Sequence, residues 1–286
     1  MLAAIARHLL PCLLATTVAA ADWKLIFSDE FNHDGHPDPA KWDYEHGFVR
    51  NKELQWYQPE NATCANGLLV IEARREVRAN PRHNPASKDW RDQRPDITIT
   101  SACLITKGCF SFTYGKAEAR IRIDTRPGSW PAFWTLSANA GGFQAPDFAE
   151  VDTMEYYQNT ILANVFYRHG GKICGPAVKR PLAKFGGEAW AKEFHVYTME
   201  WDAERITIAV DGEVLNTFRV SDDDEPGQVN GFRMPHYLLL NQAIGGNCGG
   251  APAHTEFPVR LEVDWVRVYQ KNEQANATAT LPRDTR

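Results

Sequence analysis

The chain has 286 residues, of which 43% are hydrophobic and 23% charged, and its formal net charge at neutral pH is −5. These values are ordinary for a globular protein with an ample core. No block of basic residues stands out, which argues against nucleic acid as a partner. Aromatic residues make up 11%, with nine tryptophans, several in polar, turn-rich surroundings. Such rings suit ligands with apolar faces and polar edges, of which sugars are the commonest.

Residues 1–21 have the pattern of a secretory signal. Arg7 precedes an apolar run that ends in small residues, so cleavage before Asp22 is the simplest prediction. A membrane anchor is the alternative, but Arg7, His8 and Pro11 interrupt the run and leave it short for a bilayer. The sequence therefore predicts a secreted protein, extracellular or periplasmic, without stable membrane insertion.

Between residues 22 and 271 the dominant period is two. Residues 114–123 and 259–265 alternate small or apolar side chains with charged ones, which is typical of half-buried antiparallel strands. Residues 205–215 read as a hairpin, because Asp211-Gly212 supplies the positive φ angles of a type I′ turn. Many short strands without sustained helical periodicity predict an all-β fold, a two-sheet antiparallel sandwich.

Two segments lack this alternation. Residues 74–94 are rich in Arg, Asn, Pro and Asp, and we expect a long surface excursion between strands. Residues 272–286 are polar and small, which predicts a flexible tail. The domain itself is expected to cover residues 22–271.

The most informative segment carries three acids within six residues: Glu150, Asp152 and Glu155. In a regular strand Glu150 and Asp152 share a face, while Glu155 points to the other. A β-bulge at Thr153 or Met154 would return Glu155 to the face of the other two. The three acids would then line one groove.

Clustered acids in an otherwise apolar strand favour catalysis, because burying carboxylates together is costly. Cleavage of a glycosidic bond with retention needs two carboxyl groups, one a nucleophile and the other an acid/base. Mutual repulsion keeps one protonated while the other stays ionised. The alternative is a surface strand whose acids bind cations or remain solvated.

Two tryptophans lie just upstream of the acids. Trp130 and Trp134 are four residues apart, so in a strand they share a face and can stack on sugar rings. Core packing is the alternative for Trp134, whereas Trp130, which precedes a proline, is expected to be more exposed.

With Cys12 in the signal, five cysteines remain, and an odd number cannot pair completely within one chain. Cys174 with Cys248 is the favoured pair, since both lie in glycine-rich loops. No cysteine spacing resembles a zinc site.

Taken together, these blocks resemble glycoside hydrolase family 16, a family of retaining endo-β-glucanases and galactanases. The segments that carry the resemblance are residues 27–31, 51–57, 66–74, 106–108, 130–134, 150–155 and 263–269. The resemblance implies a β-jelly-roll, concanavalin A-like sandwich with an open concave cleft. Matched by motif position, it implies that Glu150 is the nucleophile, Asp152 the assisting acid and Glu155 the acid/base. The spacing resembles the bulged version of laminarinases and agarases.

The resemblance also implies further site residues. A structural calcium on the convex face would use backbone oxygens of Glu30 and Gly67 and the carboxylate of Asp264, while catalysis would need no cofactor. The residues expected to bind substrate, besides the two tryptophans, are Asn51, Tyr156, Asn241 and Gln242. Where many members carry a histidine on the strand after the acids, this chain has Phe166, which leaves the particular polysaccharide open.

The sequence thus predicts a secreted, monomeric retaining endo-glycosidase acting on internal β-glycosidic bonds, most simply those of β-1,3- or mixed-linkage glucan. A galactanase of the agarase or carrageenase type is the alternative within the family. A non-catalytic glucan-binding jelly roll is the alternative outside the enzymes.

Overall fold

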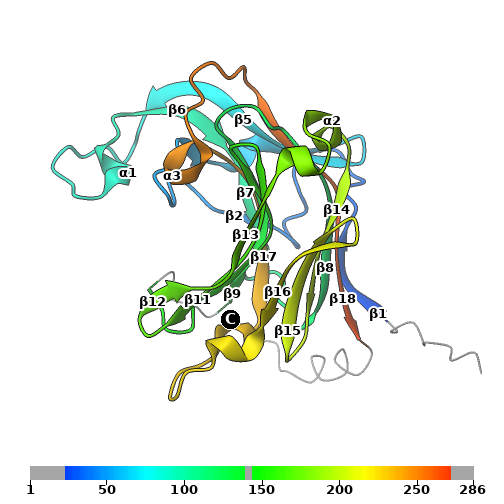
Figure 1. Cartoon of the computed structure of the whole chain (residues 1–286). Coiled ribbons are helices and arrows are strands. Elements are labelled where there is room, and N and C mark those ends of the chain that lie inside the picture. The colour runs from blue at the N-terminus through cyan, green and yellow to red at the C-terminus, as the bar shows by residue number, and fades with distance from the viewer. Residues whose placement is uncertain (1–22, 139–143, 272–286) are drawn as a thin grey trace, which may run out of the picture.

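The computed structural model describes residues 23–138 and 144–271. The predicted signal at 1–21 and tail at 272–286 lie outside these residues. The described chain forms two β-sheets that face each other, as Figure 1 shows, and nearly all pairings are antiparallel. The predicted two-sheet sandwich is confirmed.

The larger sheet has ten strands in the order β16-β15-β14-β8-β18-β5-β6-β3, with β1 paired to β18 and β4 to β5. Its strands are β1 (Trp23–Asp29), β3 (Gln55–Tyr57), β4 (Ala62–Ala65), β5 (Leu68–Ala79), β6 (Asp96–Ser101), β8 (Gly115–Ile123), β14 (His195–Trp201), β15 (Arg205–Val210), β16 (Glu213–Arg219) and β18 (Val259–Lys271). The pairing of β3 with β6 is parallel.

The smaller sheet has eight strands in the order β12-β11-β10-β9-β17-β7-β2, with β13 also paired to β11. Its strands are β2 (Asp43–Tyr44), β7 (Cys103–Ile105), β9 (Ser129–Ser137), β10 (Ala149–Tyr157), β11 (Thr160–His169), β12 (Lys172–Cys174), β13 (Ala177–Pro181) and β17 (His236–Ile244).

The helices are single turns. They are the α-helices α1 (Trp90–Gln93), α2 (Glu188–Ala191) and α3 (Gly246–Gly249), and the 3-10 turns η1 (Pro59–Asn61), η2 (Leu182–Lys184), η3 (Val220–Asp223) and η4 (Gly231–Arg233). Within the described residues, none of the helices has the length and apolar character needed to cross a bilayer.

Alternation along the strands builds the core between the sheets. Burial along β8 alternates strictly, with Ala117, Ala119 and Ile121 fully buried against the facing sheet and the charged residues between them half-buried outside. In β17, by contrast, all nine residues are buried. A strand buried on both faces means that the outer face of the smaller sheet is also covered, by side chains and loops that build a site there.

The predicted hairpin is confirmed. β15 and β16 pair around Asp211 and Gly212, whose φ angles are +48° and +81°. The predicted excursion at 74–94 is wrong in its first part, because β5 continues to Ala79 and pairs with β6. The charged composition of this segment had suggested a loop. Charged side chains are nevertheless compatible with a strand, because the strand is held by its paired backbone.

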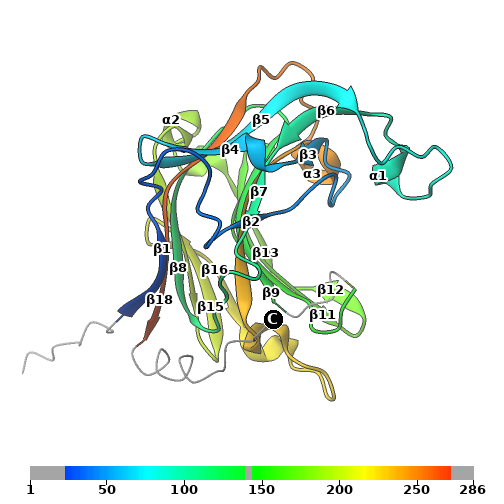
Figure 2. The same ribbon diagram turned by 180° about the vertical axis from the view of Figure 1, so that it is seen from behind.

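The smaller sheet curves so that its outer face is enclosed from two directions. In Figures 1 and 2, β11 and β12 lie at one end of this face, and α1 and α3 lie at the other. Gly175 makes the first arrangement possible: at φ +124°, its missing Cβ would lie 1.9 Å from the Val165 carbonyl oxygen. Only glycine fits there, and the chain can therefore cross from β12 to β13 while both strands pair with β11.

Candidate active site

A β-bulge brings the three acids to one face of β10. Asp152 pairs with Asn164 of β11 and Glu155 pairs with Leu162, so three steps on β10 match two on β11. The pairing with β9 shifts between Asp152 and Met154 in the same way. The extra residue reverses the alternation, so Met154 is fully buried in the core and Glu155 lies with the other two acids. The predicted bulge is confirmed.

The acids line a cavity of about 270 Å³ on the outer face of the smaller sheet. Glu150 and Asp152 are almost entirely buried, at 8% and 4% exposure, and Glu155 is half-buried. The other side chains that line the cavity are Arg50, Asn51, Glu53, Trp130, Ala132, Trp134, Phe148, Tyr157, Asn164, Phe166, Ile173, Asn241, Ala243 and Cys248.

Both carboxylate oxygens of Glu155 accept hydrogen bonds. Trp130 Nε1 donates to Oε1 at 2.8 Å, and Asn164 Nδ2 donates to Oε2 at 2.7 Å. Asn164 Nδ2 also lies 3.3 Å from Asp152 Oδ2. These donors fix the orientation of Glu155 and oppose the effect of burial, which raises the pKa of this carboxyl.

Burial dominates the protonation of the other two acids. It raises the pKa of Glu150 to about 8, helped by the negative charge of Glu155 and opposed by Arg50. Burial and the two glutamates also raise the pKa of Asp152 well above its usual range. Asp152 is hydrogen-bonded to both glutamates, so the three carboxyls share protons as one system.

A second set of contacting side chains lies on the side of the cavity that β9 and β17 form. Trp134 Nε1 donates to Asn241 Oδ1 at 2.7 Å, and the Arg50 guanidinium lies 5.0 Å from the Trp134 ring centroid. Arg50 is also paired with Glu45, which holds the cation in place. Trp134 and Trp130 both reach the cavity, as their spacing predicts, but they are only 5% and 7% exposed. Trp130 is the more exposed of the two rings, as expected, but the difference is small and its Nε1 is bonded to Glu155.

Asn51 reaches the cavity from a strained loop. Asn51 and Lys52 have φ angles of +54° and +52°, in the left-handed region that L-residues rarely occupy. Buried Glu53 holds the loop, since it accepts hydrogen bonds from Asn51 Nδ2 at 3.1 Å, Gln55 Nε2 at 2.7 Å and the Tyr57 hydroxyl at 3.3 Å. The loop therefore presents Asn51 to the cavity at a fixed place.

Known proteins share this fold. Residues 54–267, well over half of the chain, match the model of Glycosyl hydrolases family 16. The chain belongs to this family. It is a glycoside hydrolase with the family's jelly-roll fold.

Among known proteins, this family 16 chain is similar to a beta-glucanase from Rhodothermus marinus, with 35% identity over 88% of this chain and 86% of the relative. It is also similar to a keratan-sulfate endo-1,4-beta-galactosidase from Sphingobacterium multivorum, with 32% identity over 90% of this chain but 57% of the relative.

Two solved structures show the same fold. The catalytic domain of a laminarinase from Thermotoga petrophila has a TM-score of 0.74 and 33% identity, covering 88% of this chain and all of that one. A structure from a group of endo-acting O-glycanases of human gut bacteria that initiate mucin breakdown has a TM-score of 0.81 and 29% identity, covering 92% and 96%.

Two of the residues expected to bind substrate lie elsewhere in this glycoside hydrolase. Gln242 is fully buried, and its Nε2 donates to Ser129 Oγ at 3.1 Å. Tyr156 is buried in the core, where its hydroxyl donates to the Thr125 carbonyl. Both corrections have the same cause: neighbours on a strand point to opposite faces, so Asn241 and Tyr157 occupy the cavity in their place.

The residues expected to hold calcium do not fit a cation well. The Asp264 carboxylate, the one side chain expected to bind calcium, pairs with Arg120. The described part of the chain has no group of three acidic, histidine or cysteine side chains suited to a metal. A guanidinium thus already neutralises the one predicted carboxylate ligand, and a calcium ion bound by the backbone oxygens of Glu30 and Gly67 stays a prediction.

The expected disulfide is wrong. Cys174 and Cys248 are both free thiols. Cys174 lies in β12 opposite Tyr167, whereas Cys248 lies in α3 and lines the cavity with its thiol hydrogen-bonded to Tyr157. Glycine-rich surroundings indicated loops, but they carried no information on which loops meet.

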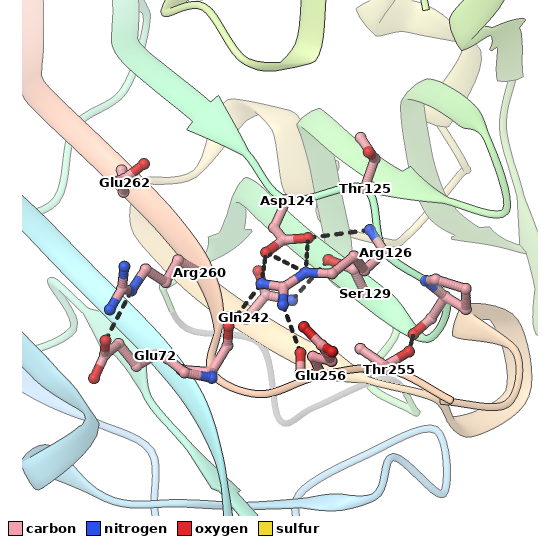
Figure 3. Close-up of polar contacts among 12 residues, drawn as sticks. Glu72, Asp124, Thr125, Arg126, Ser129, Gln242, Thr255, Glu256, Arg260 and Glu262 are labelled. Carbon is pink, nitrogen blue, oxygen red and sulfur yellow. Dashed lines mark hydrogen bonds and ion pairs between the residues drawn. The ribbon is translucent and has the colours of Figure 1, made fainter. Parts of the chain in front are cut away.

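A larger depression, of about 1320 Å³, lies beyond α3 and contains none of the three acids. Figure 3 shows two ion pairs here: Asp124 with Arg126, which line the depression, and Arg260 with the neighbouring Glu72. Arg126 also donates to the Glu256 and Pro258 carbonyls, so it ties the end of β8 to the loop before β18. These contacts cross-link one end of the sandwich, and the depression lies at that end.

Proposed function

We propose that this enzyme hydrolyses internal β-glycosidic bonds of a polysaccharide with retention, through a covalent glycosyl-enzyme. The observation that supports this most is the bulge, which turns Glu155 into the cavity that already holds Glu150. Two carboxyl groups in one cavity, with a third acid hydrogen-bonded to both, suit double displacement.

In the first step, a Glu150 oxygen forms a bond to the anomeric carbon while Glu155 protonates the leaving glycosidic oxygen. In the second step, Glu155 takes a proton from water, whose oxygen attacks the same carbon and releases Glu150. Glu150 must be ionised for attack and Glu155 protonated, while burial favours a protonated Glu150 and the Trp130 and Asn164 donors favour an ionised Glu155. Asp152 is hydrogen-bonded to both glutamates, and it therefore provides the route by which a proton passes from Glu150 to Glu155.

For the substrate we propose β-1,3- or mixed-linkage β-glucan. The beta-glucanase and laminarinase similarities support this choice, and the Trp130, Trp134, Asn51 and Asn241 side of the cavity offers the rings and amides that sugars use. A β-galactoside is the second candidate, favoured by the similarity to the keratan-sulfate endo-1,4-beta-galactosidase. We also propose export, supported by the signal-like pattern of residues 1–21, with N-terminal sequencing of the exported protein as its test.

The test is release of reducing ends from laminarin, lichenan, agarose and carrageenan by wild type, Glu150→Gln and Glu155→Gln. The proposal requires activity on at least one polymer and its loss in both variants. Activity that survives either substitution contradicts the mechanism. Binding of a polymer without cleavage by wild type supports the glucan-binding alternative.

A further inference from the structure

The excursion between β5 and β6, residues 80–95, is a folded unit beside the cleft. Asn80 joins its two ends, because its backbone N–H donates to the Pro95 carbonyl at 2.9 Å and its Nδ2 donates to the Arg91 and Arg94 carbonyls at 2.9 and 2.8 Å. Asn80 is buried, so these bonds lie inside the excursion. In Figures 1 and 2, α1 of this excursion lies with α3 at one end of the outer face of the smaller sheet.

Two arginines of the excursion contact the loop that carries Asn51. Arg94 donates from Nη1 to the Glu53 carbonyl at 2.5 Å and from Nη2 to the Lys52 carbonyl at 2.8 Å. Arg91 Nε donates to the Val49 carbonyl at 3.1 Å. All three acceptors are backbone groups, and a guanidinium presents its donors in a rigid fork. The two arginines therefore fix the main-chain path of residues 49–53.

Aromatic rings hold the guanidinium of Arg94 in place. It lies 4.5 Å from the centroid of the Phe48 ring and 4.7 Å from a ring centroid of Trp90. Phe48 is buried and packs edge-on against Trp56, at 5.4 Å between ring centroids. The rings attract the cation and shield it from water, and hydrogen bonds are stronger in such surroundings. Arg94 is therefore a rigid donor to the loop.

The loop needs this support because its backbone is strained. Asn51 and Lys52 both have left-handed φ angles, and such strain persists only where surrounding contacts impose the conformation. One further contact comes from α3, where the Asn247 N–H donates to the Asn51 carbonyl at 2.8 Å. Glu53 accepts one of the two hydrogens on Asn51 Nδ2, so the second hydrogen and Oδ1 can serve a ligand in the cavity.

We propose that residues 80–95 form a positioning element for substrate binding, in which Arg94, together with Arg91, holds residues 49–53 so that Asn51 faces the cavity. Neither arginine belongs to the described residues that line the cavity, so both act through the loop. The proposal rests on the proposed function, because it assigns Asn51 a hydrogen bond to the sugar. It gives the charged excursion a role in binding the substrate.

The test is a double-mutant cycle on the polymer that wild type cleaves best among laminarin, lichenan, agarose and carrageenan. Arg94→Ala should raise KM about 3- to 10-fold, the range for one neutral hydrogen bond, and leave kcat within about twofold of wild type. In an Asn51→Ala background the same change should leave KM unaltered, because the contact that Arg94 positions is already gone. Arg82→Ala is the matched control, since this arginine of the same excursion pairs with Asp92 and its loss should not change KM.

Three outcomes overturn the inference. Arg94→Ala could raise KM equally in both backgrounds, change kcat alone or leave KM unchanged, and in each case Arg94 does not act through Asn51. Cleavage by wild type that Glu150→Gln abolishes would leave the proposed function intact in all three. Arg91→Ala enters the same cycle if Arg94→Ala does not fold.

Hydrogen exchange provides a readout independent of turnover. The Glu53 and Leu54 amides, which are bonded to the Arg50 and Ile244 carbonyls, should exchange faster in Arg94→Ala than in wild type or Arg82→Ala. Amides of β8 should keep their wild-type protection in all three proteins. If no polymer is cleaved, the proposed function fails; faster exchange then still supports the hold on the Asn51 loop, whereas equal exchange overturns it.

Discussion

Trp130 Nε1 donates a 2.8 Å hydrogen bond to Glu155 Oε1. This contact makes Trp130 a positioning residue for the proposed acid/base, where the spacing of the tryptophans had suggested a stacking platform. Because the bond stabilises the ionised carboxylate, it lowers the pKa of Glu155 against the effect of burial.

Replacing the indole therefore has two expected effects. Trp130→Phe should reduce kcat by about 10- to 100-fold, the equivalent of one hydrogen bond to a charged group. It should also move the alkaline limb of the kcat/KM pH profile upward, since the pKa of Glu155 rises without the donor. Trp265→Phe, on the outer face of the larger sheet, is the control. An unchanged pH profile in Trp130→Phe would show that the bond has no part in catalysis.

The order of the two glutamates is tested by azide rescue of alanine variants. If Glu150 is the nucleophile, azide should restore cleavage by Glu150→Ala and give a glycosyl azide of inverted anomeric configuration. Rescue of Glu155→Ala should give the retained configuration, because the covalent intermediate still forms. Product anomers identified by NMR decide the assignment, and the opposite pattern would exchange the two roles.

Glu150 should make stability depend on pH. Its pKa is about 8 in the folded protein and near 4.5 when unfolded, so the folded state binds more protons between these values. The stabilising contribution is therefore complete below pH 4.5 and is lost as the pH rises to about 8. Glu150→Gln stays neutral, so its Tm should exceed that of wild type by a margin that grows over this window, by roughly 4–8 °C for about 2 kcal/mol. Parallel Tm curves measured by calorimetry would refute a buried proton on Glu150.

Glu53 should support both stability and substrate binding. Glu53→Ala leaves the Asn51, Gln55 and Tyr57 donors without their acceptor, which should cost about 2–4 kcal/mol. The released Asn51 loop should raise KM more than it lowers kcat. Steady-state kinetics and thermal unfolding measure the two effects. Exposed Glu200→Ala is the control, and a KM equal to that of wild type would mean that the loop keeps its place without Glu53.

Arg120 should compete with calcium for the Asp264 carboxylate. Arg120 already neutralises Asp264, so chelation with EDTA should change the Tm by less than about 1 °C, and added calcium should restore nothing. A fall of several degrees that calcium reverses would show that the ion displaces Arg120 from Asp264.

The pattern along the chain was sufficient for much of the fold. Alternation predicted β8, β18 and the β15–β16 hairpin, because side-chain burial in a sheet repeats every two residues. The pattern did not place Gln242 and Tyr156, which were assigned to the cavity by motif position. Each lies one residue from a side chain that does reach the cavity, Asn241 and Tyr157 respectively. The pattern also missed the end of β5, where charged side chains accompany a paired backbone.

The sequence by itself determined the three acids, the extended segment that carries them and the extra residue needed to align them. Those features are local, since they depend on spacing along one strand. Only the tertiary structure decided what surrounds the acids: the Trp130 and Asn164 donors to Glu155, the Arg50 charge near Glu150 and the Phe166 ring opposite Glu150. These groups come from other strands and loops, and their distances depend on how the sheets curve and pair, which no local pattern specifies.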